Sequence, residues 1–350
     1  MKRLGLFLVT AVATLPAWAA DQPLVLASQG SFFVGGETKT SPTLGGPGAA
    51  GAPAAPQDVT INQMYVQYQK PVNADRHVPV VMVHGCCLSS KTWETTPDGR
   101  MGWNEYFVRK GRSVYLADQS SRARSGFDAT VINAVKSGAA PPSQLPNIFA
   151  ASHQTSWTLF RFGPEFNKAF PDEQFPVQAA DELYKQMIPD LNGTLPTPNP
   201  TLKNMAALAV QLKGAVLIGH SESGFFPEEA ALEDPSGVRG IISIEMGCPE
   251  KKPDELAKLA KIPILIMFGD HLGDVPGRFA NTWTTNFDTC QKFVGQVKQA
   301  GGDAEMMSLP AMGIKGNSHM LMQDKNNLQL ADLILGWIDQ HVERTKSARR

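Results

Sequence analysis

Val216-Leu217-Ile218-Gly219-His220-Ser221-Glu222-Ser223-Gly224 is the stretch of sequence that decides the fold. Its apolar run predicts a buried strand, and the small residues that follow predict a sharp turn with a helix beyond it. Ser221 stands at the tip of that turn, two residues after the glycine. Bulky side chains next to Ser221 would clash with the neighbouring strand and helix. The side chain of Ser223 is small enough to avoid such a clash. The stretch therefore predicts a serine nucleophile presented at the end of a strand.

The segments around this stretch alternate between strand and helix patterns. Continuous apolar runs are typical of strands that are buried on both faces of a parallel sheet. Besides the strand before Ser221, strands are predicted within residues 23–34 and at 60–68, 78–83, 113–117, 240–244, 262–268 and 304–309. Helices are predicted at 92–110, 177–191, 201–213, 226–232, 254–260, about 290–300 and 327–342. This alternation predicts an α/β fold with a mostly parallel, doubly wound sheet.

Two stretches do not fit the simple alternation. Residues 41–56 are rich in Gly, Ala and Pro, which predicts a surface loop or linker. The stretch from about 126 to about 212 carries many prolines and aromatic residues, and a single crossover helix needs far fewer residues. We therefore expect a cap insert at about 126–212, ahead of the nucleophile strand, within one large α/β domain of residues 21–350.

The N-terminus has the features of a secretory signal peptide. Lys2 and Arg3 precede a short apolar run at 4–15, and Ala17-Trp18-Ala19 provides small residues for cleavage near Ala19-Ala20. Residues 1–20 are therefore predicted to be a signal peptide. The mature protein is predicted to be periplasmic or secreted, where its even number of cysteines, four, favours disulfides.

Composition excludes several classes of partner. The chain has 350 residues, of which 42% are hydrophobic, so it is long enough to bury a full core. Its 32 basic and 33 acidic residues give a net charge of −1, which predicts neither a nucleic-acid partner nor a membrane partner. The sequence contains no cluster of residues with metal-ligand spacing, and we expect no metal and no cofactor.

A serine hydroxyl needs a base to take its proton and a carboxylate to orient that base. Of the seven histidines, His319 stands in a Gly/Asn/Ser loop after the last predicted strand and just before the last helix. His84 opens another loop, and His220, beside the serine, is expected to point into packing. His319 is therefore the candidate base.

Three carboxylates are candidates for the acid. Glu245 follows the strand after the serine strand, whereas Asp270 and Asp274 follow the next one. Any of the three satisfies the order serine, acid, histidine along the chain. Glu245 is favoured because it lies between apolar neighbours, where a carboxylate needs a partner, and because its longer side chain could reach His319 from one strand further away.

The tetrahedral intermediate of acyl transfer needs two backbone N–H donors for its oxyanion. The residue after the nucleophile, Glu222, should supply one, and Cys86, after His84-Gly85, should supply the other. Adjacent Cα atoms are about 3.8 Å apart, below the usual disulfide range, so a Cys86–Cys87 bond would be strained. The residues alone leave open whether these two pair; if they do, Cys248 pairs with Cys290.

Taken together, these residues resemble the α/β-hydrolase superfamily and, more narrowly, the exported bacterial esterases of the esterase 713 (Alcaligenes) type. The resemblance is carried by His84-Gly85-Cys86-Cys87, by Gly219-His220-Ser221-x-Ser223-Gly224, by Glu245 and by His319. It implies the α/β-hydrolase fold, a triad of Ser221, His319 and Glu245, a Cys86–Cys87 disulfide and a homodimer.

The functional prediction is an exported serine carboxylesterase that hydrolyses small to medium apolar esters through an acyl-enzyme. Lactonase, amidase or thioesterase activity with the same triad is the alternative, because the turn around Ser221 does not distinguish the leaving group. A non-catalytic binding protein on the same fold is the remaining alternative. It is disfavoured because such proteins commonly lose the serine or the histidine, and this chain keeps both.

Overall fold

The computed structural model describes residues 22–41, 57–72, 74–191 and 195–343. The predicted signal segment, residues 1–20, and nearly all of the predicted loop at 41–56 lie outside the described residues. Within the described residues, no helix is both long and apolar enough to cross a membrane.

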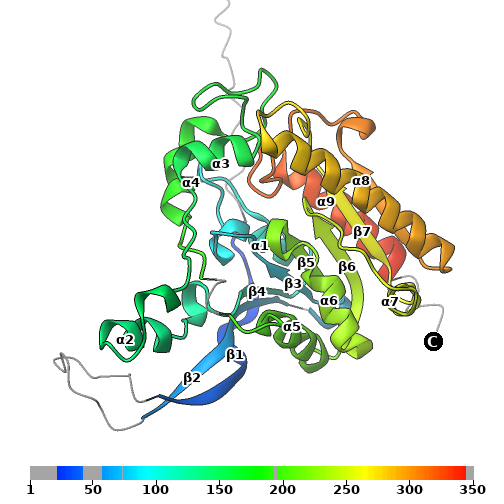
Figure 1. Cartoon of the computed structure of the whole chain (residues 1–350). Helices are drawn as coiled ribbons and strands as arrows, with labels where there is room; N and C mark the ends of the chain where they lie inside the picture. Colours follow the sequence, from blue (N-terminus) through cyan, green and yellow to red (C-terminus); the bar gives the residue numbers. More distant parts are fainter. Residues whose placement is uncertain (1–21, 42–56, 73, 192–194, 344–350) are drawn as a thin grey trace, which may run out of the picture.

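One eight-stranded sheet runs through the described part of the chain (Figure 1), in the order β1-β2-β4-β3-β5-β6-β7-β8. The β1–β2 hairpin is antiparallel and joins β4 antiparallel, and all pairs from β4 to β8 are parallel. The predicted mostly parallel sheet is confirmed. The strands are β1 (Leu26–Ser41), β2 (Gln57–Pro71), β3 (Val80–Val83), β4 (Val114–Asp118), β5 (Ala215–His220), β6 (Val238–Ile244), β7 (Ile264–Phe268) and β8 (Ala304–Ser308).

Helices cover both faces of this sheet, as the continuous apolar strands require. They are α1 (Trp103–Arg109), α2 (Thr130–Lys136), α3 (His153–Leu159), α4 (Ala180–Gln186), α5 (Pro200–Gln211), α6 (Phe226–Glu233), α7 (Pro253–Leu259), α8 (Arg278–Gln299) and α9 (Asn327–Ile338). Side chains of α1 and α9 pack on one face, and side chains of α5, α6, α7 and α8 pack on the other.

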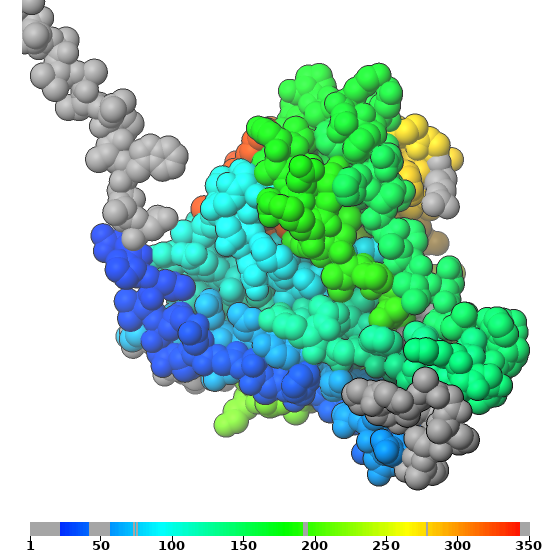
Figure 2. Space-filling view, turned by 90° about the vertical axis from the view of Figure 1, so that its left-hand side faces the viewer, coloured from blue at the N-terminus to red at the C-terminus, as the bar shows by residue number. Residues whose placement is uncertain are grey.

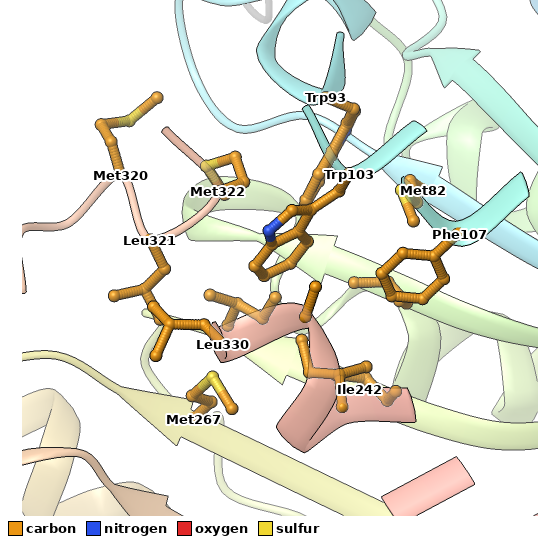
Figure 3. Close-up of a cluster of buried hydrophobic side chains, with 14 of the residues drawn as sticks. Met82, Trp93, Trp103, Phe107, Ile242, Met267, Met320, Leu321, Met322 and Leu330 are labelled. Carbon is orange, nitrogen blue, oxygen red and sulfur yellow. The ribbon is translucent and has the colours of Figure 1, made fainter. Parts of the chain in front are cut away.

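The two-residue period of a strand divides the core into these two layers. Met82 of β3, for example, packs with the first layer, whereas its neighbours Val81 and Val83 pack with the second. Figure 3 shows the first layer, where Met82 lies next to Phe107, and Ile242 lies below Trp93, Trp103 and Phe107. The turn carrying Met320, Leu321 and Met322, just after His319, is buried in the same layer. The histidine loop is thus anchored by hydrophobic burial.

The prediction of one helix over residues 92–110 is wrong. The chain forms a short 3-10 turn at Ser90–Trp93, then a loop, and then α1. Gly99 adopts a φ of 83° inside a turn closed by its N–H donating to the Thr96 carbonyl, which interrupts the helix. The predicted helix at 177–191 is also shorter, because α4 ends at Gln186 and the next residues bond to other loops.

The helix predicted near residues 290–300 is longer than expected, since α8 begins at Arg278. The extra turns add a wall beside the carboxyl ends of the strands. Within residues 126–191, α3 and α4 lie together at the top of Figure 1, and α2 lies lower, near the β1–β2 hairpin. An ion pair between Lys39 and Asp128, at 2.6 Å, joins that hairpin to the segment before α2. Figure 2 shows the bright green residues of this stretch above the blue residues of the β1–β2 hairpin.

Candidate active site

The turn at Ser221 has the strained backbone that a nucleophile at a strand end requires. Ser221 has a φ of 57°, in the left-handed region that non-glycine residues rarely adopt. The chain folds back so tightly that a Cβ on Gly219 would lie 2.0 Å from the Ser223 carbonyl oxygen. A Cβ on Gly224 would lie 2.2 Å from the Met246 Cβ. The small residues noted in the sequence are therefore required by close backbone packing.

Ser223 contributes more than small size to this turn. It is fully buried, and its hydroxyl donates to the Val83 carbonyl at 2.9 Å. The same hydroxyl accepts the backbone N–H of His220 at 3.1 Å. Val83 ends β3, the strand that leads into the loop of His84 and Gly85. The serine at position 223 thus fixes the nucleophile turn to the neighbouring loop.

His319 and Glu245 meet in the interior of the protein. The His319 Nδ1 lies 3.2 Å from Glu245 Oε2, and both side chains are fully buried. The His319 backbone N–H donates to the Phe160 carbonyl at 2.9 Å. Among the described residues, the His319 Nε2 has no hydrogen-bond partner. It is therefore the ring nitrogen left for a proton transfer.

Glu245 is held as a carboxylate by the groups around it. Its Oε1 accepts the Gly269 N–H at 2.5 Å and the Arg161 Nη2 at 2.6 Å. Burial by itself raises the pKa of Glu245, but the charge of Arg161 and the bond to His319 outweigh burial and lower that pKa to about 2. Glu245 is thus ionised at neutral pH and can orient a neutral imidazole.

The two rival carboxylates bond elsewhere. Asp270 accepts the backbone N–H groups of His271 at 2.8 Å and Gly316 at 3.0 Å. Asp274 lies 2.8 Å from the Nδ1 of His271. The structure therefore brings Glu245 to His319, and it uses Asp270 and Asp274 in the turn after β7.

His220 is buried in packing, as predicted, and part of that packing is the ring of His319. The two ring centroids are 4.6 Å apart, and the His220 Nε2 lies 2.9 Å from the His319 carbonyl oxygen. Phe160 and Trp283 also pack on His319, with centroids at 5.3 Å and 4.5 Å. Aromatic and imidazole rings thus enclose the candidate base and exclude water from it.

The environment of His319 predicts a broad pH range of activity. Burial lowers the pKa of His319 below its ordinary value of 6.5; Glu245 opposes this shift, and Arg161 adds to it. The other titratable groups near His319 are His220 and the buried Asp324. Because the base must be neutral, we expect kcat/KM to stay constant above pH 6.5 and to fall only at lower pH.

This pH profile can be measured with a soluble ester in a pH-stat. Aliquots returned to pH 7.5 control for inactivation, because acid unfolding would also reduce the rate. A reversible midpoint clearly above 6.5 would show that His319 is not the titrating base, or that its surroundings do not disfavour the imidazolium.

The loop after β3 lies directly against Ser221. A Cβ on Gly85 would lie 2.7 Å from the Ser221 Cβ, so only glycine fits at this contact. The His84 Nδ1–H donates to the Gly85 carbonyl at 2.8 Å, and its Nε2 accepts the Gln119 N–H at 3.2 Å. Burial lowers the pKa of His84 to about 4, so this histidine is neutral and holds the loop in place. The amides of Cys86 and Glu222 flank this contact along the chain.

The structure contains both disulfides that the sequence reasoning considered. Cys86 is bonded to Cys87, with Cα atoms 3.8 Å apart. Cys248 is bonded to Cys290, with Cα atoms 4.8 Å apart, and this bond joins the loop after β6 to α8. The Cys87 carbonyl accepts the Ile188 N–H at 2.9 Å, which connects the loop after β3 to the segment after α4.

Glu222 faces the same cavity as Ser221, but a cation offsets its charge. The Arg122 Nη1 donates to Glu222 Oε2 at 3.0 Å, and Arg122 also pairs with Asp190. The Arg122 side chain is fully buried, whereas the Glu222 side chain is 21% exposed. The predicted oxyanion residue is thus held in place by a buried ion pair.

The cavity at Ser221 measures about 510 Å³. Its lining comes mainly from the nucleophile turn, the loop after β6 and α8: Ser221, Glu222, Phe225, Glu245, Met246, Gly247, Cys248, Pro249, Trp283, Asn286 and Thr289. A larger cavity, of about 1130 Å³, is lined by residues that precede the strands, such as Ser113 and Gly214. Ser221 follows its strand, so the larger cavity is at the opposite end of the sheet and does not contain the nucleophile.

Two groups of described side chains lie close enough to share a metal ion. Cys86 and Cys87, in one group with Asp190, are bonded to each other. In the other group, Asp172, Asp270 and His271, the His271 Nε2 lies 2.9 Å from Asp172. Neither group includes Ser221, His319 or Glu245, and we assign a metal to neither.

Sequence reasoning missed two arginines, Arg122 and Arg161. Each is fully buried and pairs with a carboxylate of the site. Arg161 is the one charged residue in the otherwise apolar run Leu159-Phe160-Arg161-Phe162, and a lone charge in such a run needs a buried partner. That signal was available in the sequence, although it does not identify the partner.

Comparisons with known proteins place this geometry among hydrolases. A solved structure of a novel bacterial esterase is 51% identical and superposes with a TM-score of 0.86, covering 95% of this chain and 100% of that one. A probable secreted lipase, phiG, from a fungal species is 26% identical over 333 residues, covering 79% of this chain and 86% of the relative. No protein-family model matches the chain.

Proposed function

Given that the chain belongs to the α/β-hydrolase family and is a carboxylic ester hydrolase, we propose that it is an exported serine carboxylesterase with a triad of Ser221, His319 and Glu245. The observation that carries the proposal is the fully buried His319–Glu245 pair behind the strained Ser221 turn. A buried, ionised carboxylate that orients a neutral imidazole is the arrangement that activates a serine hydroxyl.

In the proposed reaction, the Ser221 Oγ attacks the ester carbonyl carbon while the His319 Nε2 takes the hydroxyl proton. The negative charge on the carbonyl oxygen is stabilised by the backbone N–H groups of Cys86 and Glu222. The imidazolium then gives its proton to the leaving alcohol, and the acyl group stays on Ser221. His319 next takes a proton from a water molecule whose oxygen attacks the acyl carbon. The imidazolium then returns this proton to the Ser221 Oγ as the carboxylic acid leaves. Throughout, Glu245 holds the Nδ1–H side of His319.

The lining of the cavity supports small to medium apolar esters as substrates. Apolar side chains of Phe225, Met246 and Trp283 form much of its wall, and its volume of about 510 Å³ lies within the range of small-molecule sites. Its charged lining residues, Glu222 and Glu245, are both carboxylates. Arg161 pairs with Glu245, but Arg122 is shared between Glu222 and Asp190, so a net negative charge remains beside the cavity and disfavours substrates that are themselves carboxylates.

Export of the protein is supported by its cysteines and by its relative. Two disulfides are expected in an oxidising compartment, and the fungal relative is described as a probable secreted lipase. We propose a signal peptide at residues 1–20, cleaved near Ala19-Ala20, and a cap insert at about 126–212. The homodimer also remains a proposal, which rests on the resemblance to the 713-type esterases.

A substrate panel tests the function. We expect turnover of p-nitrophenyl acetate and butyrate, with kcat/KM about tenfold lower for the dodecanoate because the longer chain exceeds the cavity. Rates should saturate below the solubility limit of each ester. The matched anilide and a lactone should be slower than the matched ester. A faster anilide or lactone would indicate an amidase or lactonase, and activity that appears only above the solubility limit would indicate a lipase.

A further inference from the structure

Three consecutive residues at the end of α3 each contact a different part of the site. The Leu159 carbonyl accepts the Trp283 Nε1–H at 3.1 Å, and the Phe160 carbonyl accepts the His319 N–H at 2.9 Å. The Arg161 guanidinium donates to Glu245 at 2.6 Å. The segment Leu159–Arg161 thus touches α8, the histidine loop and the acid in turn.

Arg161 is the central residue of these contacts. It is fully buried, and its φ of 60° turns the chain sharply after α3. Its Nη2 bonds to Glu245 at the end of β6, and its Nε donates to the Asp270 carbonyl at 2.7 Å, just after β7. Its guanidinium also lies over the Trp283 ring, 4.8 Å from the centroid.

We propose that Arg161 is a positioning residue of the triad, which orients Glu245 against His319 by bonding its second oxygen and joining the ends of β6 and β7. This inference rests on the proposed function. Arg161 does not line the Ser221 cavity, so it acts through Glu245 and not on the substrate.

The two oxygens of Glu245 have separate partners. Oε1 accepts Arg161 and the Gly269 N–H, which leaves Oε2 for the Nδ1 of His319. Without the guanidinium, Oε1 keeps one donor, and a buried carboxylate loses its cation, which is strongly unfavourable. Glu245 would then rotate or take up a proton, and either change misplaces the imidazole.

Lysine cannot replace the arginine in this role. A guanidinium is a planar fork whose donors point in fixed directions, so a single side chain can bond to Glu245 and to the Asp270 carbonyl together. An ammonium supplies the same charge from one point. The lysine variant therefore separates the charge of Arg161 from its geometry.

The charge of Arg161 also affects the titration of the triad. The titratable groups that face His319 are Glu245 and His220, with Asp324 and Glu173 behind the histidine loop. Burial raises the pKa of both Asp324 and Glu173. Arg161 contacts Glu245 directly, at 2.6 Å, and its charge lowers the pKa of His319. Removing it favours protonation of the Glu245–His319 pair whichever residue takes the proton. The acid limb of kcat/KM should therefore move to higher pH.

The test compares Arg161→Gln, Arg161→Lys and a matched control, Arg112→Gln. Arg112 is also a buried arginine with two carboxylate partners, Asp339 and Glu343, but it precedes β4 at the other end of the sheet. For Arg161→Gln we expect kcat to fall about 10²-fold, KM to stay within about threefold, and the acid limb to move up. For Arg161→Lys we expect kcat to fall about tenfold with an unmoved acid limb. The control should keep wild-type kcat and pH profile.

Several outcomes would overturn the inference. It fails if Arg161→Gln keeps wild-type kcat and acid limb, if Arg161→Lys regains wild-type kcat, or if Arg112→Gln loses as much kcat as Arg161→Gln. If Arg161→Gln does not fold, Arg161→Lys, which keeps the buried charge, decides the test alone. Organophosphonate labelling of the wild type at Ser221 distinguishes a failure of the proposed function from a failure of the inference about Arg161. Without labelling the proposed function itself fails, and with labelling only the role of Arg161 is at stake.

Discussion

Replacing Ser221 by alanine is expected to reduce kcat by about 10⁶-fold, because the acyl-enzyme can no longer form. The remaining rate would come from substrate binding and from the oxyanion donors alone. In parallel, an organophosphonate should label the wild-type protein once, at Ser221, as measured by intact mass and peptide mapping. The S221A variant should remain unlabelled under the same conditions.

Ser223→Ala is the matched control for this experiment. Its hydroxyl is two residues from the nucleophile, and it bonds to the Val83 carbonyl, so its loss should lower the free energy of unfolding by about 1–3 kcal/mol. Labelling should nevertheless remain at Ser221. A label on another serine, or none on the wild type, would show that the turn does not present a nucleophile and that the esterase proposal is wrong in its mechanism.

Replacing Glu245 by glutamine should lower kcat by about 10⁴-fold while the side chain keeps its shape. A glutamine carries no negative charge to stabilise the imidazolium, and it can donate to Nδ1, which favours the wrong tautomer of His319. It also leaves the buried Arg161 without its carboxylate partner. Steady-state kinetics on a soluble ester, with circular dichroism to verify folding, measure this effect.

Asp274→Asn is the control for the acid. Asp274 is 63% exposed and pairs with His271, so its replacement should change kcat by less than about threefold. The opposite result, with near-normal turnover in E245Q and a large loss in D274N, would move the acid to the turn after β7. The His319–Glu245 contact would then have to be structural.

The end of α3, within the proposed insert at about 126–212, has a consequence for how the enzyme meets its substrate. Phe160 bonds to the backbone of His319, and Arg161 neutralises Glu245, so lifting the end of α3 away would break both contacts. Exposing Glu245 without its cation would also disrupt the orientation of the base. We therefore expect this part of the insert to stay in place during turnover, unlike a lid that opens on a lipid surface.

Local pattern was enough to predict most of the fold. The strand runs, the alternation with helices and the small residues around Ser221 are all signals within a few residues of one another, and each is confirmed. The turn at Gly99, which interrupts the predicted helix at 92–110, is an equally local signal. The prediction missed it because the apolar periodicity on either side favoured one continuous helix. The length of α8 was missed because Asn281, Thr282, Thr284 and Thr285 have low helix propensity and interrupt the apolar residues of its first turns.

Local sequence pattern could not identify the candidate acid or the arginine that pairs with it. Sequence order left Glu245, Asp270 and Asp274 open. The apolar neighbours and the longer side chain of Glu245 favoured it, and the family resemblance strengthened that preference. The structure distinguishes them by contacts: Glu245 lies against His319, 74 residues away along the chain, and against Arg161, 84 residues away.

By itself, the sequence determined the sheet, the serine turn and the candidate base, because hydrophobic period and backbone sterics act between near neighbours. The tertiary structure alone decided which carboxylate is buried beside His319 and which cation keeps that carboxylate ionised. Those two facts depend on desolvation and charge pairing between distant segments. Such energies are set by distances of a few ångströms that exist only after the chain has folded.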